Sequence, residues 1–235
     1  MERFSLRAVS VNEARRKHQI NRLSYLGKFF RTVNGMSYSD FTIDLLKEQF
    51  AIELIEDVLL FPNPSVLPVP QRLAELLQSY LPLAITINTE KARSELIIAP
   101  ILADLKLQYK DRLSLFSGIE FTIDKAKGLN GRCDYILSKT KEQLALNAPL
   151  LMMVEAKNEN IVEGIPQCIA EMIAAQLFNT QKKIPISNIY GVVTTGSLWR
   201  FLKLTGQQAS VDIIEYPIQQ LDTILGILQD IINIS

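Results

Sequence analysis

Two acidic residues and one lysine stand where the sequence predicts the ends of buried strands. Residues 148–154 (APLLMMV) are apolar without alternation, as expected of a central strand that is buried on both faces. The apolar run stops at Glu155-Ala156-Lys157, and because side chains alternate along a strand, Glu155 and Lys157 point to the same face. Two opposite charges at the end of a core strand need a partner, which is either each other or a metal ion and a substrate.

The preceding predicted strand carries a third charged residue. Asp134 lies among apolar neighbours in RCDYILSK, at 132–139. If the two strands pair antiparallel through the 139–149 connection, Asp134 lies opposite the Glu155 end. Two carboxylates within a few ångströms of each other raise each other's pKa unless a divalent cation bridges them. Lys157 beside them would stabilise charge on a phosphate or orient a water, so the three residue types favour metal-assisted hydrolysis.

Structural interpretations stand beside this one. Glu155 and Lys157 would form an ion pair at the strand exit, and Asp134 would accept backbone hydrogen bonds at a strand end. The geometry of the two strands decides between a site and a structural role.

Histidine and cysteine usage narrows the chemistry further. His18 is the only histidine and lies in a basic segment, which excludes Ser-His-Asp and Cys-His catalysis unless His18 is recruited. Cys133 and Cys168 have no CxxC spacing and are typical of reduced core thiols in a cytoplasmic protein. A metal here must therefore be a hard cation held by oxygen ligands, for which Mg²⁺ or Mn²⁺ fits best.

Composition and charge indicate a cytoplasmic globular protein. Of the 235 residues, 48% are hydrophobic and 21% are charged, which is usual for a soluble α/β domain. No apolar run approaches the ~20 residues that cross a bilayer, and the N-terminus has no apolar signal core, so we expect no membrane partner. Residues 1–35 carry eight Lys or Arg against two Asp or Glu, while the whole chain is neutral. The remainder is therefore acidic, which counts against tight non-specific DNA binding but not against local basic patches.

The pattern of elements predicts a mixed sheet with helices on both faces. Ser39 or Asp40 would begin a first helix, the four prolines of 61–70 require a loop, a helix follows at 70–80, and LPLAITIN (81–88) indicates a strand or extended connector. Ser94 would cap a helix at 95–107, in which Pro100 causes a bend or a new turn. Strands follow within 113–124, 132–139 and 148–157, then a helix at 163–178, strands at 189–196 and 198–204, and a helix at 217–232.

These residues and this order resemble a known enzyme superfamily. Gly131-Arg132-Cys133-Asp134, followed by Glu155-Ala156-Lys157, is similar to the D…ExK signature of the PD-(D/E)XK nucleases, with Cys133 where the superfamily name has proline. The resemblance covers roughly 90–205, and the AKNEN and QCIAEMIAAQ segments resemble a largely uncharacterised bacterial branch. It implies an α/β fold with a restriction-endonuclease-like core (α-β-β-β-α-β) at 90–235, a helical accessory region at 36–89 as an N-terminal extension, and a basic arm at 1–35.

The resemblance also implies roles for four residues. Asp134 and Glu155 would be metal ligands, with the carbonyl of Ala156 as a third oxygen. Lys157 would position the attacking water or stabilise the transition state. The implied activity is a Mg²⁺- or Mn²⁺-dependent nuclease acting on nucleic acid, with DNA favoured over RNA. A homodimer is possible in such a protein, and the apolar C-terminal helix would supply either a dimer contact or core packing.

Further polar residues have both functional and structural interpretations. The resemblance implies that Glu95 adds to the metal shell, although an acidic residue also suits the start of a helix. It implies that Gln167 supports the site, although this residue would also suit solvent. Glu171, one turn later, shares that face, and Asn158 and Glu159 are more typical of a turn than of a site.

Aromatic and basic residues leave a second function open. Trp199 and Tyr190 could stack on bases but are more typical of a core, and Arg15-Arg16-Lys17 belongs to a solvated arm or contacts phosphates. Met36 precedes the first well-patterned helix, so residues 1–35 are either a functional arm or a segment outside the functional protein. The acidic core and the lack of an evident DNA-binding domain are also compatible with a catalytically silent fold that serves as a nucleic-acid-binding or protein-interaction module.

Overall fold

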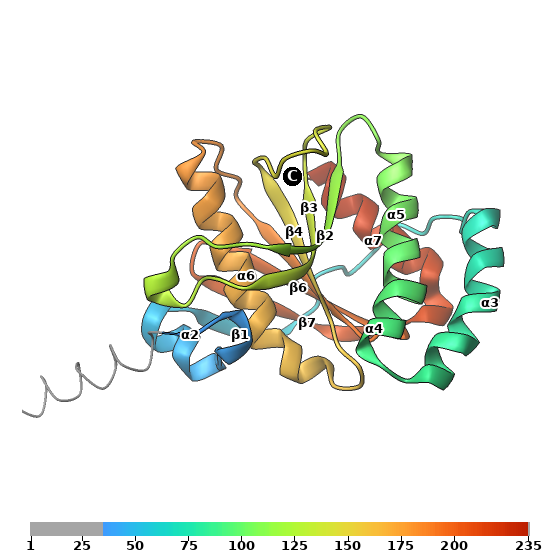
Figure 1. The fold of residues 1–235 in the computed structure, drawn as a ribbon, viewed down its shortest axis with the longest axis horizontal. Helices are drawn as coiled ribbons and strands as arrows, with labels where there is room; N and C mark the ends of the chain where they lie inside the picture. Colours follow the sequence, from blue (N-terminus) through green and yellow to red (C-terminus); the bar gives the residue numbers. More distant parts are fainter. Residues whose placement is uncertain (1–34, 235) are drawn as a thin grey trace, which may run out of the picture.

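Seven strands form one mixed sheet in the order β1-β7-β6-β5-β4-β3-β2 (Figure 1). The computed structural model describes residues 35–234, so the expectations for the basic arm, His18 and Arg15-Arg16-Lys17 lie outside the described residues. The strands are β1 (Glu53–Val58), β2 (Ser114–Glu120), β3 (Arg132–Ser138), β4 (Leu150–Ala156), β5 (Ile189–Thr194), β6 (Leu198–Thr205) and β7 (Gln208–Pro217). The predicted α/β class with a mixed sheet is confirmed.

Strand directions follow from the connections between them. β2, β3 and β4 form an antiparallel meander, and β5, β6 and β7 form another. β4 and β5 are parallel, which requires a crossover, and the helix α6 (Ile161–Gln181) supplies it. β4 is buried along its whole length, as its continuous apolar sequence predicts.

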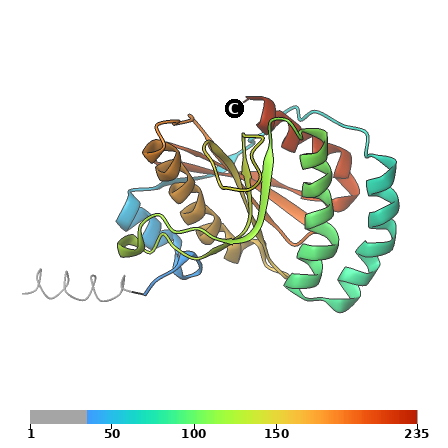
Figure 2. The ribbon, with the colours of Figure 1, turned by 45° about the horizontal axis from the view of Figure 1, so that its top comes forward.

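Helices cover both faces of the sheet and enclose two cores. One face packs against α6 and α2 (Ile43–Phe50), and the other against α3 (Gln71–Ile87), α5 (Ala99–Gln108) and α7 (Leu221–Ile234) (Figure 2). Six apolar residues of α7 are at most 1% exposed: Ile224, Leu225, Ile227, Leu228, Ile231 and Ile232. They belong to the core, so this face of α7 does not supply a contact to a second copy.

The helix before the site starts earlier than the sequence indicates. It begins with α4 (Glu90–Arg93), and the N-cap is Thr89, whose hydroxyl accepts a hydrogen bond from the Ala92 amide. The predicted cap at Ser94 is therefore wrong. Residues Ser94–Ile98 form a π-helical turn (η2), and α5 continues from Ala99 with Pro100 in its first turn. Proline lacks an amide hydrogen and clashes with the carbonyl four residues earlier, which explains the wider turn and confirms the new turn predicted there.

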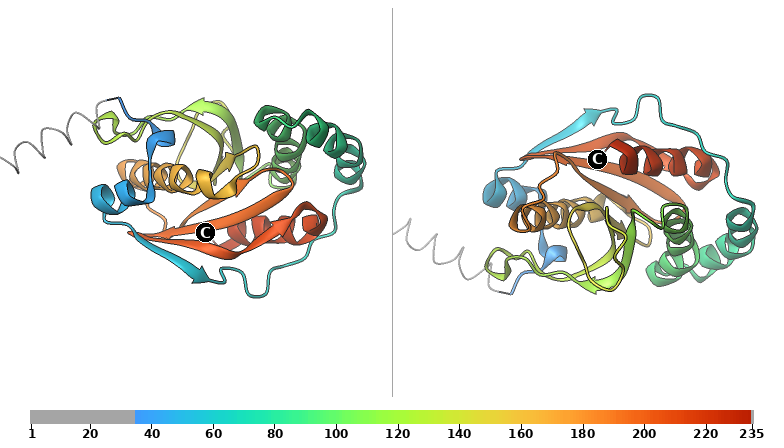
Figure 3. Two further views of the ribbon diagram at one scale, coloured as in Figure 1. Left: turned by 90° about the horizontal axis from the view of Figure 1, so that it is seen from below. Right: turned by 90° about the horizontal axis from the view of Figure 1, so that it is seen from above.

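Two strands and one helical segment differ from the sequence-based prediction. The 81–88 segment continues α3 rather than forming a strand or connector, because the buried face of Leu73, Leu77 and Ala84 extends into it. The expected helical region at 36–89 is wrong at β1, which pairs parallel with β7 at the sheet edge (Figure 3). β7 was not predicted at all. The C-terminal helix α7 begins at Leu221, a few residues after the predicted start.

The crossover helix is both long and apolar. Within residues 35–234, α6 is the one helix whose length and composition would suit a membrane span, and 61% of its most apolar window is buried. It packs on β4 and β5, so burial inside the protein accounts for its composition.

Candidate active site

The ends of β3 and β4 bring Asp134 and Glu155 together, as the antiparallel pairing predicts. Tyr135 lies opposite Val154, so the next pair outward is Asp134 and Glu155. The backbone amide of Ala156 donates a hydrogen bond of 2.8 Å to Asp134 Oδ2. The two carboxyl groups interact electrostatically, since the charge of Asp134 raises the pKa of Glu155. Two acidic side chains separated by twenty residues of chain therefore lie next to each other at the end of a buried hairpin.

Lys157 completes this group from the residue just after β4. Its amide donates to the Thr194 carbonyl, which keeps the backbone in line with β5. Its Nζ lies 2.5 Å from Glu155 Oε1 and 3.2 Å from Gln167 Oε1. The side chains of Lys157 and Glu155 are 21% and 3% exposed, so the ion pair is shielded from solvent. This geometry holds an ammonium group beside the two carboxyl groups.

A glycine on α6 makes room for the lysine. A Cβ atom on Gly164 would lie 2.6 Å from Val193 Cγ1 and 3.1 Å from Lys157 Cγ. Only a residue without a side chain lets α6 approach the sheet this closely while the stem of Lys157 passes beneath it. Sequence reasoning did not identify Gly164, although a glycine in an otherwise apolar helix is a signal of close packing.

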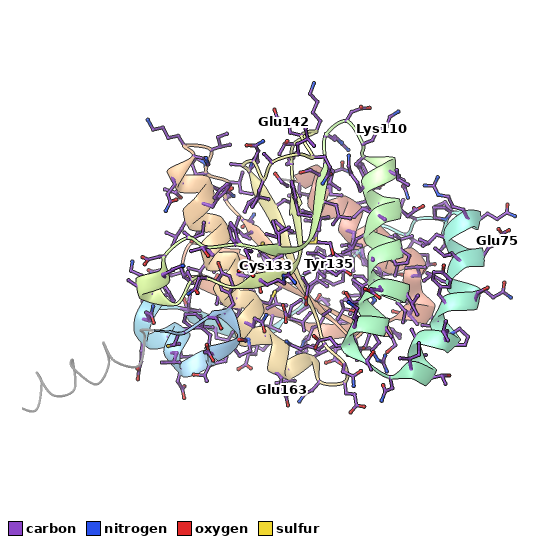
Figure 4. All side chains as sticks on the ribbon, in the orientation of Figure 1. Glu75, Lys110, Cys133, Tyr135, Glu142 and Glu163 are labelled. Atoms are coloured by element: carbon purple, nitrogen blue, oxygen red, sulfur yellow. The ribbon has the colours of Figure 1, made fainter. Side chains whose placement is uncertain are left out.

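Two polar residues of α6 extend the group into the core. Gln167 Nε2 donates to Glu171 Oε1 over 3.3 Å, while Gln167 Oε1 accepts from Lys157. The structure therefore places Gln167 at the site rather than in solvent. Glu171 is fully buried near Cys133 and Cys168, which are free and buried thiols as predicted. Cys133 lies near the middle of the molecule in Figure 4.

Burial dominates the electrostatics of the site. It raises the pKa of Glu155 to about 8, with the Asp134 charge adding to the shift and Lys157 opposing it. The pKa of Asp134 is also raised by burial, despite the Ala156 amide and the Lys157 charge, which lower it. Burial lowers the pKa of Lys157, but the charge and hydrogen bond of Glu155 outweigh it, so this pKa is raised. Burial and the Glu155 charge hold the pKa of Glu171 well above its ordinary value.

A cavity of about 280 Å³ opens next to Asp134 and Ala156. The helix 90–108 and the strands β2 and β3 supply most of its walls. Its lining comprises Glu90, Lys91, Ser94, Glu95, Ala99, Ser117, Gly118, Arg132, Asp134, Tyr135 and Ala156. Of the residues grouped at the ends of β3 and β4, Asp134 and Ala156 line this cavity, whereas Glu155, Lys157 and Gln167 do not.

Two glutamates of this helix line the cavity, and only one of them was predicted. Glu95 has a side chain that is 62% exposed and forms an ion pair with Lys91 at 3.3 Å, so it lies at the cavity but outside the hydrogen-bonded group. Glu90 interacts electrostatically with Asp134, Glu155 and Lys157. Burial raises the pKa of Glu90, and the Lys157 charge opposes this shift. Glu90 was missed because the helix was expected to start at Ser94.

Buried side-chain oxygen atoms without a hydrogen-bond partner lie in the site and beside it. Glu155 Oε2, Glu171 Oε2 and Asn158 Oδ1 are buried and have no hydrogen-bond partner within the described residues. Between Gly35 and Ile234, no three His, Cys, Asp or Glu side chains converge as a ready-made metal cage. Mg²⁺ is commonly held by one or two carboxylates and keeps several waters, so an acidic pair with a free buried oxygen suits it. The residues present therefore fit a hard divalent cation.

Other candidates have structural roles. Trp199 is fully buried and Tyr190 is 5% exposed, which favours their interpretation as core residues. Glu159 accepts a hydrogen bond from Asn88, at the corner between α3 and α4. Asn158 and Glu159 lie in the bend between β4 and α6, as predicted for a turn.

No protein-family model matches the sequence, and no curated protein is significantly similar to it. A function for the protein is therefore proposed from the geometry of the site.

Proposed function

We propose that the protein is a Mg²⁺- or Mn²⁺-dependent nuclease with a restriction-endonuclease-like core. The helix 90–108, the meander β2-β3-β4, α6 and β5 follow each other in the order α-β-β-β-α-β that the resemblance implies. The observation that carries the proposal is the convergence of Asp134, Glu155 and Lys157, with Glu155 Oε2 buried and unpartnered. A purely structural ion pair leaves that oxygen and its desolvation cost unexplained.

The acidic pair would hold the cation. Asp134 and Glu155 would be its protein ligands. Glu90 is the better placed additional carboxylate, because it interacts with these residues whereas Glu95 pairs with Lys91. The cation would supply a water of lowered pKa and stabilise negative charge on phosphate oxygens. Burial of Glu155 strengthens these interactions, because charges attract more strongly where water is excluded.

Lys157 would act on the substrate directly. Glu155 and Gln167 fix its ammonium group, and Gly164 fixes the path of its stem. A fixed ammonium beside a phosphodiester donates hydrogen bonds to oxygens that gain charge during the reaction, and it needs no reorganisation to do so. Burial lowers the pKa of this ammonium group, but the charges of Glu155, Glu90 and Asp134 raise it and so oppose its loss of charge.

A cleavage assay tests the proposal. Purified protein with Mn²⁺ should cut DNA or RNA, and Asp134→Ala, Glu155→Ala and Lys157→Ala should each lower the rate by at least about 10²-fold. Glu163→Ala is the matched control, because Glu163 is exposed on the outer surface of α6 (Figure 4). This variant should cleave at the wild-type rate. Cleavage that persists in all three variants overturns the proposal. Binding of nucleic acid without cleavage by the wild type would instead favour a silent binding module.

A further inference from the structure

The cavity beside Asp134 has walls of different charge. The helix 90–108 contributes two carboxylates, Glu90 and Glu95, and one cation, Lys91, which is already paired with Glu95. The wall from β2 and β3 contributes Ser117, Gly118 and Arg132 beside Asp134. The acidic pair, Asp134 and Glu155, would hold a cation. An anion would then be stabilised by the positive charge on the strand wall beside them.

Arg132 is the free cation of this cavity. Its side chain is exposed and makes no hydrogen bond or ion pair with any residue of the described chain. Glu120 is its cross-strand neighbour in the β2–β3 register, yet the two side chains do not form an ion pair. The guanidinium group is planar with five donors and matches the oxygens of a phosphate in a two-pronged contact. Its fork is therefore available for a ligand.

Gly118 leaves space between this arginine and the acidic pair. The β2–β3 register places Gly118 across from Asp134, and its φ of +61° disfavours any other residue. Apart from the two chain neighbours of Gly118, no residue has an atom within 4 Å of the position that a Cβ would occupy. β2 is the edge strand of the sheet, so no further strand covers this opening. A ligand that enters at the edge can pass Gly118 and reach Asp134.

We infer that Arg132, assisted by the exposed Ser117, binds the phosphate next to the scissile phosphate on the same strand. This inference rests on the proposed nuclease function and specifies its substrate class. Two adjacent phosphodiesters are then recognised together, one at Asp134, Glu155 and Lys157 and the other at Arg132. The substrate is a polynucleotide strand, not a mononucleotide or a small isolated diester.

Two substrates separate this role from the chemistry of cleavage. Bis(4-nitrophenyl) phosphate has a scissile diester but no neighbouring phosphate, whereas an oligonucleotide has both. With Mn²⁺, Arg132→Ala should lower kcat/KM for the oligonucleotide by about 10–100-fold, the range for loss of a hydrogen bond to a charged group. It should leave hydrolysis of the small diester unchanged. Arg132→Lys keeps the charge, so its kcat/KM for the oligonucleotide should lie between the values of the wild type and Arg132→Ala.

A binding measurement gives a readout that does not depend on turnover. The affinity for a labelled oligonucleotide is measured with Ca²⁺ at several salt concentrations. The slope of log affinity against log salt concentration should be shallower by about one in Arg132→Ala than in the wild type. Lys110→Ala is the control, because Lys110 is an exposed cation at the far end of α5 (Figure 4) and should keep the wild-type slope.

The outcomes distinguish this inference from the function on which it rests. If the wild type hydrolyses neither substrate, the proposed function fails. If it cleaves both, and Arg132→Ala slows both equally or neither, the neighbouring-phosphate site is wrong while the nuclease stands. An unchanged salt slope in Arg132→Ala contradicts the site in the same way.

Discussion

The two ends of β4 differ in whether their buried polar groups have hydrogen-bond partners. At its start, Asn179 of α6 is 1% exposed and bonds both backbone groups of Leu150, accepting from the amide at 2.7 Å and donating to the carbonyl at 2.9 Å. At its end, Glu155 Oε2 and the nearby Glu171 Oε2 have no partner within the described residues. Buried polar groups are normally satisfied, so the first end serves the fold. The second end keeps unmet bonding capacity, which is expected where a ligand completes the group.

The largest change is expected at the satisfied end. Asn179→Ala leaves the amide and carbonyl of Leu150 buried without partners, which should lower the free energy of unfolding by about 2–4 kcal/mol. Chemical denaturation measures this loss. The cleavage rate per folded molecule should stay at the wild-type value, because Asn179 lies at the opposite end of the strand.

A neighbouring position provides the control for Asn179. Thr180→Ala changes an exposed residue of the same helix and should shift stability by less than about 0.5 kcal/mol. An Asn179→Ala variant that is as stable as Thr180→Ala would show that the contact with Leu150 contributes nothing.

At the other end, a single methyl group should disturb the site. Gly164→Ala forces a Cβ against Val193 and the stem of Lys157, so α6 or the lysine must move. We expect a loss of about 1–3 kcal/mol in stability from overpacking. We also expect a loss of cleavage that exceeds any loss of folded protein. Unfolding curves and rates corrected for the folded fraction measure the two effects.

A second substitution on α6 isolates the cause. Glu163→Ala changes the same turn of α6 without approaching the sheet, and it removes only the exposed hydrogen bond that Glu163 accepts from the N-cap residue Asn160. If Gly164→Ala behaves like Glu163→Ala, the close approach of α6 to Lys157 does not matter.

The smallest effect concerns the pH dependence of stability. Glu171 has a folded-state pKa well above its ordinary value of 4.5, so the native state holds a proton that the unfolded state loses. The stability contributed by this proton is fully present below pH 4.5 and falls as pH rises toward the folded-state pKa. Glu171→Gln keeps an acceptor for Gln167 but does not titrate.

The variant and the wild type should therefore diverge with pH. Near pH 4 their stabilities should agree, and at pH 8 Glu171→Gln should be the more stable by about 1 kcal/mol or more. Denaturation at several pH values tests this. A constant difference across that range would mean that Glu171 is ionised in the folded protein.

The contrast between the two ends also explains what the sequence could predict. Asp134, Glu155 and Lys157 were identified because strand alternation and an antiparallel hairpin are local rules that fix which side chains meet. Gln167 was predicted only through the resemblance, because its position near the start of the next helix suited solvent equally well. Asn179 was not identified, because its partner Leu150 lies twenty-nine residues earlier and no local pattern links them.

The misses have physical causes of the same kind. Glu90 was overlooked because Thr89 rather than Ser94 caps the helix, and a π-helical turn before Pro100 keeps the two segments continuous. β1 was read as helix because the preceding helix ends at Ala51, whose left-handed φ of 54° is not signalled by a glycine. Its pairing with β7 is a long-range contact that single-segment patterns do not contain.

Calorimetric titration with Mn²⁺ tests the central claim most directly, because it asks whether the unmet oxygens at the end of β4 bind a cation. The wild type and Asn179→Ala should bind Mn²⁺ alike, whereas Asp134→Asn and Glu155→Gln should bind it at least about tenfold more weakly. Wild-type protein that binds no Mn²⁺, or variants that bind it as tightly as the wild type, would contradict the account.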